Sequence, residues 1–279
     1  MRIVWFGFLI LLVGISTAGA QSTIIFEMKD PAGDDWGAGA LAYPGHEIFS
    51  AGLFDLQKFR VSADETHFYF DFQFPAVTNP FQAPEGYFHQ RLEVYMDTSF
   101  PGGNENIILG GWRLRTRPQY GWEVRLSVAP FNETRLFTWD SQGLRQYDQG
   151  VSSSLQADGK TIRAKVERGL LAGQPECRRW RYYVLVGSFD GLSPGSWRPL
   201  GDNSLWQAGG EGPPVFDLLA PRWGWKTQKR QLARGVLSPV SVAGVKVSLW
   251  IKIGLISLLG IAVLFGAAYH LRRWNNDGA

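Results

Sequence analysis

The stretch HFYFDFQF, His67 to Phe74, decides the fold class of this chain. Phenylalanine occupies every second position from Phe68 to Phe74, and more polar residues stand between these positions. Successive side chains of a strand point to opposite faces of its sheet. The alternation therefore predicts a strand with one face buried in a core and the other face nearer to solvent.

The same period of two recurs along the chain, and residues that favour turns separate the repeats. In one repeat, Val124 and Leu126 are expected opposite Trp122. Between the two apolar ends, no segment keeps a 3.6-residue apolar period long enough for a major helix. We therefore predict an all-β domain, an antiparallel β-sandwich, over residues 21–225. The further strand-like stretches are RLEVYMD, WEVRLSV, KTIRAKVE and RYYVLVGSF.

The two ends of the chain are apolar and suggest export and anchoring. The first has one early arginine, a short apolar run and the small residues AGA before Gln21, as in a cleaved signal peptide. The second is long enough to span a bilayer and is followed by two arginines. We expect a single-pass protein of the cell membrane with an extracytoplasmic body. The predicted segments are a signal peptide at 1–20, a basic linker at 226–245, a transmembrane helix at 246–271 and a cytoplasmic tail at 272–279.

Composition and motif searches argue against several classes of function. The formal net charge of +3 comes largely from the ends, and no basic patch carries the interleaved aromatic residues that single-stranded nucleic acid needs. The single cysteine excludes a disulfide framework. The chain contains no H-E-x-x-H or phosphate-binding loop motif. We therefore expect a protein that is not an enzyme and does not bind nucleic acid.

The loop DPAGDD, residues 30–35, concentrates three carboxylates: Asp30, Asp34 and Asp35. They are compatible with a cation site, a catalytic pair or a solvated turn. No partner carboxylate stands out for glycoside hydrolysis, which needs two such groups across a cleft. Calcium is bound by six to eight oxygens, and a turn containing Pro31 and Gly33 can bring carboxylates onto one such ion. We favour a structural calcium site.

Aromatic residues make up 14% of the chain, and nine of the twelve tryptophans lie in the predicted exported body. A flat indole face packs against the CH face of a sugar ring, while polar neighbours bind its hydroxyls. This supply of aromatic rings is typical of carbohydrate recognition. The candidate residues are Trp112, Trp122, Trp139, Trp206, Trp223 and Trp225.

Several stretches, taken in order, resemble the C-terminal binding module of glucodextranases and related exported amylolytic enzymes. The resemblance covers about residues 24–231. That family belongs to a sandwich superfamily shared by DOMON-like domains and family-nine carbohydrate-binding modules. The stretches are DPAGDDWGAGALAYP, FSAGLFDLQKFRVS, FPAVTNPFQAPEGYFHQRLEVYMDT, FDGLSPGSWRPL with WQAGGEG, and PPVFDLLAP.

The resemblance implies a non-catalytic DOMON-like sandwich that binds a polysaccharide or cell-envelope glycan. It also implies a calcium ion near the acidic loop, and on this basis we add Asp55 and Asp97 to Asp30, Asp34 and Asp35 as metal ligands. An accessory protein that docks an extracytoplasmic partner is a second possibility. A third is a haem b domain that transfers electrons, as in some DOMON-like relatives. The candidate haem ligands are Met28, Met96, His67 and His89.

Overall fold

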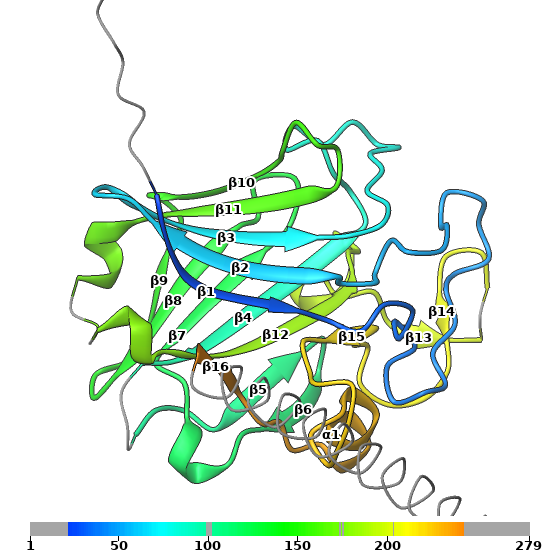
Figure 1. Cartoon of the computed structure of the whole chain (residues 1–279). Coiled ribbons are helices and arrows are strands. Elements are labelled where there is room, and N and C mark those ends of the chain that lie inside the picture. The colour runs from blue at the N-terminus through cyan, green and yellow to red at the C-terminus, as the bar shows by residue number, and fades with distance from the viewer. Residues whose placement is uncertain (1–21, 99–101, 173, 175, 203, 243–279) are drawn as a thin grey trace, which may run out of the picture.

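The structure is a computed structural model that describes residues 22–98, 102–172, 174, 176–202 and 204–242. Two antiparallel sheets pack face to face as a sandwich (Figure 1). The predicted all-β sandwich is thereby confirmed. The predicted signal peptide and transmembrane helix lie outside the described residues. Within the described residues, no helix is long and apolar enough to cross a bilayer.

The smaller sheet has five strands in the order β1-β2-β3-β11-β10. Its central strand, β3, contains the phenylalanine alternation, and Phe68, Phe70 and Phe72 are buried as predicted. On the opposite face of β3, Asp71 forms an ion pair with Arg163 of β11 at 2.6 Å. The strands are β1 (Thr23–Lys29), β2 (Lys58–Ala63), β3 (His67–Gln73), β10 (Val151–Leu155) and β11 (Thr161–Glu167).

The larger sheet has the order β15-β12-β4-β7-β8-β9, and β16 pairs with the beginning of β12. Its two central strands, β12 and β4, run antiparallel over eight paired residues, from Arg181 opposite Asp97 to Ser188 opposite Gln90. The strands are β4 (Gln90–Asp97), β7 (Val124–Val128), β8 (Arg135–Asp140), β9 (Gly143–Tyr147), β12 (Arg181–Ser188), β15 (Asp217–Leu218) and β16 (Val240–Ser241).

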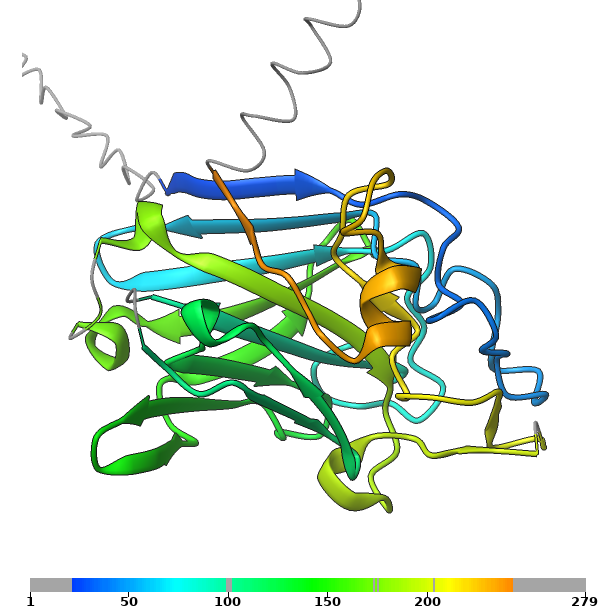
Figure 2. The same ribbon diagram turned by 90° about the horizontal axis from the view of Figure 1, so that it is seen from below.

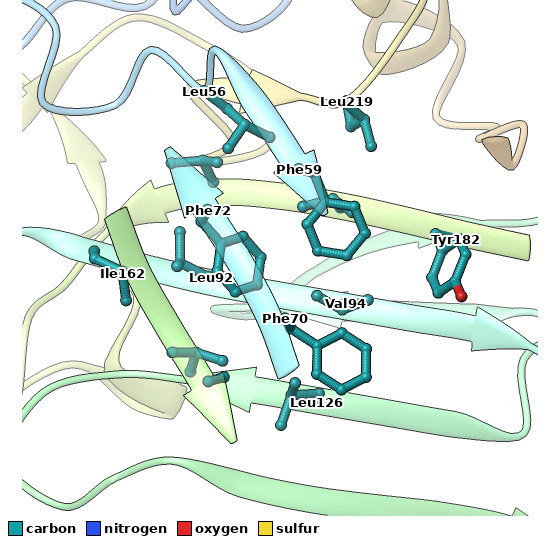
Figure 3. Close-up of a cluster of buried hydrophobic side chains, with 14 of the residues drawn as sticks. Leu56, Phe59, Phe70, Phe72, Leu92, Val94, Leu126, Ile162, Tyr182 and Leu219 are labelled. Atoms are coloured by element: carbon teal, nitrogen blue, oxygen red, sulfur yellow. The ribbon is translucent and has the colours of Figure 1, made fainter. Parts of the chain in front are cut away.

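The main core lies between the two sheets, where phenylalanines of the smaller sheet meet aliphatic side chains of the larger sheet (Figure 3). Phe59 and Phe70 face Val94 and Leu126, and all four are fully buried. Burying one such side chain contributes about 1.5 to 3 kcal/mol to folding. Burial of the alternating apolar side chains therefore stabilises the contact between the two sheets.

The larger sheet is also covered on its outer face, so β4 is buried along its whole length. A second apolar cluster there joins Tyr95 of β4 to Ile107 of β5 (Asn106–Leu109), Leu114 of β6 (Trp112–Arg115) and Leu232 of α1 (Gln228–Arg234). This third layer was not predicted. Four short 3-10 helices, the residue pairs of β13 (Leu200–Gly201) and β14 (Ala208–Gly209), and loops complete the described body.

Residues 226–242, which we expected to begin a basic linker, fold onto the sandwich. The α1 helix buries Gln228, Gln231 and Leu232 and ends at Gly235, which has the left-handed φ of +64° common after a helix. The chain then runs back across the larger sheet to β16 (Figure 2). Three of the four basic residues in this stretch, Lys229, Arg230 and Arg234, therefore lie on a folded helix and not on a free tether.

Candidate functional site

An acidic cluster of Asp30, Asp34 and Asp217 lies at the edge of the sandwich. Asp30 follows β1, Asp34 lies in the loop after it, and Asp217 begins β15. One carboxylate oxygen of each lies within 4.8 Å of the others. Oδ1 of Asp30 accepts the Ala220 backbone N–H at 2.9 Å. Among the described residues, Oδ2 of Asp30 and Oδ1 of Asp34 are buried without a hydrogen-bond partner.

Burial and mutual repulsion perturb the protonation of this cluster. The pKa values of the Asp30 and Asp217 carboxyls are raised well above the usual value, first by burial and then by a neighbouring carboxylate. The pKa of Asp34 is raised from 3.8 to about 6, again first by burial and then by the charge of Asp55. Buried carboxylates are stable in ionised form only when paired or bound to a cation. The cluster could therefore hold a metal ion.

Asp35 and Asp55 lie beside this cluster but make bonds that shape the loop. The Tyr43 hydroxyl donates to Oδ2 of Asp35 and accepts the Phe54 backbone N–H at 3.1 Å. Oδ1 of Asp55 accepts the backbone N–H of Gly33 at 2.9 Å, and Gly33 has a left-handed φ of +75°. Of the predicted metal ligands, the structure thus brings Asp30 and Asp34 together, with Asp35 and Asp55 holding the loop around them.

Asp97, the fifth predicted ligand, lies elsewhere in the fold. It forms an ion pair with Arg181 at 2.9 Å, at the beginning of β12, whereas Asp217 pairs with Val186 of the same strand. Five residues of extended strand separate these positions by roughly 17 Å. Asp97 cannot share one ion with the acidic cluster.

Sequence reasoning missed Asp217, although it lies in PPVFDLLAP, one of the stretches that carried the family resemblance. Its two carboxylate oxygens accept the backbone N–H groups of Leu56 and Leu218, each at 2.7 Å. The side chain of Gln228 bridges the two parts of the site, donating to the Asp34 carbonyl and accepting the Leu218 N–H. Helix α1 is therefore part of the structure that positions the cluster.

The six tryptophans proposed as ligand platforms differ in exposure. Trp122 is only 4% exposed and donates its indole N–H to the Asn106 carbonyl at 2.8 Å, so it belongs to the outer cluster and presents no face to a ligand. Trp139 is half-buried against Trp122. Trp112 and Trp206 are 46% and 43% exposed, respectively. Trp223 and Trp225 are 76% and 50% exposed, so four of the six candidates are open to solvent.

Trp112 borders a cavity of about 450 Å³, which we call the Trp112 cavity. Trp197 and Glu211 also line it, and the rest of the lining is largely glycine and proline. The turn between β5 and β6 places Trp112 there: Gly110 and Gly111 have φ values of +52° and +88°, as a tight hairpin turn requires.

The candidate haem ligands are used in packing. Met96 is fully buried in the main core, Met28 packs against it, and the ring of His67 lies 2.7 Å from the Thr66 hydroxyl. His89 is fully buried, and burial together with the charge of Arg198 lowers its pKa to about 4. His89 and Met96 lie seven residues apart on one extended segment, roughly 23 Å, so they cannot ligate the same haem.

Residues 25–243 of the 279 match the family model of the C-terminal binding module, SLH-like, of glucodextranase. The chain belongs to this family. The predicted resemblance is thereby confirmed, and the match extends through α1 and β16, as the fold does. A search of curated proteins found no match. The glucodextranase C-terminal module is a binding module, and no catalytic family was found for this chain.

Proposed function

We propose that this chain is a non-catalytic module that binds glycans at the cell surface. The observation that carries this proposal is the family match. It extends over residues 25–243, and the matching family is the C-terminal binding module of glucodextranase. Exposed indole rings of the kind that sugars require are present in Trp112 and Trp206.

Calcium is the ion that we propose for the acidic cluster. Three carboxylates supply hard oxygen ligands, and two of their buried oxygens have no partner among the described residues. Calcium prefers such ligands and accepts irregular loop geometry. An ion there would neutralise charges that otherwise repel, and it would join the loop after β1 to β15. The role of the ion would be structural.

The membrane location is also a proposal, based on the apolar segments at 1–20 and 246–271. The described chain is compatible with it, since β1 and β16 both approach β12 near Tyr182. The Trp112 cavity lies near the other end of β12, where Trp197 packs against Gly187. A membrane anchor after residue 242 would leave that cavity facing away from its own bilayer.

Binding to immobilised polysaccharides tests the proposed function. The full-length chain, purified in a detergent without a sugar head group, is applied to a panel of neutral and acidic glucans, galactans and cell-wall glycans. We expect retention by at least one neutral polysaccharide and elution by its soluble fragments. Retention by none of them would refute glycan binding.

Docking of an extracytoplasmic protein is a second candidate, favoured by large apolar side chains that are exposed on loops. Leu192 is 98% exposed, Leu205 59% and Phe81 49%. Exposed apolar side chains mark many interaction surfaces where they form a contiguous patch. Under this alternative, a defined partner would co-purify with the wild-type chain and would be lost from a Leu192→Ser, Leu205→Ser double variant, whereas polysaccharides would not bind.

A further inference from the structure

Trp112 differs from the other exposed tryptophans because no aromatic ring or cation of the described residues lies over its indole. His46 stacks on Trp206 with a centroid separation of 4.4 Å, and cationic side chains lie over Trp223 and Trp225. The Trp36 ring is 5.9 Å from that of Tyr43. Within the described part of the chain, no other aromatic ring or cation covers Trp112. Its indole face is available to a ligand.

The walls of the Trp112 cavity are held in place by close packing. A Cβ atom added to Gly110 would lie 2.9 Å from Cβ of Trp197, and one added to Gly210 would lie 2.5 Å from the Ala40 carbonyl oxygen. Trp197 is in turn packed against Gly187, where an added Cβ would lie 2.0 Å from the indole ring. The cavity is therefore formed before any ligand arrives, which lowers the entropic cost of binding.

The charged groups of the cavity have different roles. Hydrogen bonds within the protein fix the side chain of Arg198: its guanidinium donates to Oγ of Ser188 at 2.9 Å and to the carbonyls of Phe189 and Trp206, each at 2.7 Å. Glu211 is exposed, and its carboxylate forms no hydrogen bond or ion pair with the described residues. The cavity thus offers a ligand one aromatic face and one free carboxylate, an acceptor for hydroxyl groups that repels anions.

We propose that the Trp112 cavity binds one or two neutral hexose rings, with the CH face of a ring on Trp112 and its hydroxyls donating to Glu211. This inference rests on the proposed glycan-binding function and assigns it to one place. A volume of about 450 Å³ suits a small ligand of this kind, since such pockets measure about 300 to 1,000 Å³. The site takes a short segment of a glycan or its end.

The test measures the affinity of the full-length chain for maltose, isomaltose and cellobiose by titration calorimetry, in a detergent without a sugar head group. At least one disaccharide should bind. Trp112→Ala should weaken that binding about tenfold or more, because the stacking surface is lost. Trp112→Phe should retain part of the affinity. Glu211→Gln should weaken binding about threefold with little dependence on salt.

Trp36→Ala is the matched control, because Trp36 is 46% exposed like Trp112 but its ring lies 5.9 Å from that of Tyr43, away from the cavity lining, and it should bind like the wild type. If the wild type binds polysaccharide but no disaccharide, or if Trp112→Ala binds normally, the cavity is not the site and the proposed function still stands. If the wild type is retained by no polysaccharide, the proposed function itself fails. A strongly salt-dependent preference for choline over all three sugars would overturn the neutral-sugar assignment in favour of a cationic ligand.

Discussion

Replacing Asp34 by asparagine should have opposite effects on stability with and without calcium. Asp34 is the cleanest position for this test, because its buried Oδ1 has no partner among the described residues. Without a cation, its charge opposes folding at neutral pH, since burial and then Asp55 raise its pKa from 3.8 to about 6. With a cation, the same charge is a ligand.

The magnitude follows from the raised pKa. A group that binds protons more tightly in the folded state loses stability as pH rises from its unfolded to its folded pKa. A shift from 3.8 to about 6 corresponds to an upper limit of about 3 kcal/mol above pH 6. Partial exposure of Asp34 reduces this to about 1 to 2 kcal/mol. In a chelator at neutral pH, Asp34→Asn should therefore melt roughly 2 to 8 °C above the wild type.

Calcium should reverse this order. At about a hundred times its Kd, an ion that binds only the folded state adds about 2.7 kcal/mol, or roughly 5 to 11 °C in a domain of this size. Asp34→Asn should lose most of that increment. Thermal unfolding followed by circular dichroism, with calcium and with chelator, measures both effects.

Asp148→Asn is the control, because this exposed carboxylate lies between β9 and β10, outside the acidic cluster. Asp148→Asn should melt at the same temperature as the wild type, both with calcium and with chelator. If the wild type melts at the same temperature in calcium and in chelator, the proposed calcium site is refuted. An Asp34→Asn variant that melts below the wild type in chelator would show that the Asp34 charge does not oppose folding.

Three other positions allow direct tests of the fold. The pKa of His89 is lowered to about 4, so its contribution to stability is complete above about pH 6.5 and is lost as the pH falls towards 4. Between these two pH values, the free energy of unfolding in urea should fall by roughly 3 kcal/mol less in His89→Phe than in the wild type. Arg125→Met should destabilise the protein by about 3 to 5 kcal/mol in the same assay, because Glu93 is fully buried and Arg125 pairs with it at 2.7 Å; unchanged stability would contradict this reading. Gly187→Ala should lower stability by at least about 1 to 3 kcal/mol, because its Cβ would meet the Trp197 ring, and a Trp197→Leu background should relieve the loss.

The alternation of apolar residues was enough to predict the sandwich, because the period of a strand is visible over a few residues. The phenylalanines of β3 face the main core as this period requires. Trp122 was correctly placed opposite Val124 and Leu126, although a strict period of two would put all three on one face; it precedes β7 and is covered by the third layer of β5, β6 and α1. These covering segments are short and lie far away in the sequence. Local periodicity therefore reveals which residues share a face but not what packs on it.

The acidic cluster shows the same limit for the candidate site. Asp30 and Asp34 were found because turn-forming residues and carboxylates are adjacent in the sequence. Asp217 joins them only through the pairing of β15 with β12, which no short pattern reveals. Asp97 was assigned by resemblance, yet it stands at the opposite end of the β12 pairing, beside Arg181. Predicting which carboxylates meet requires the register of the sheet.

The meeting of β1 and β16 at Tyr182 also has a consequence for protein engineering. The Phe26 ring lies 4.8 Å from the Tyr182 ring, and Val240 pairs with the same residue. A domain whose two ends lie close together can be inserted into a loop of a host protein, or circularly permuted, without stretching its sheets. Residues 22–242 can therefore be moved between proteins as a cassette, with the Trp112 cavity on the side remote from both junctions.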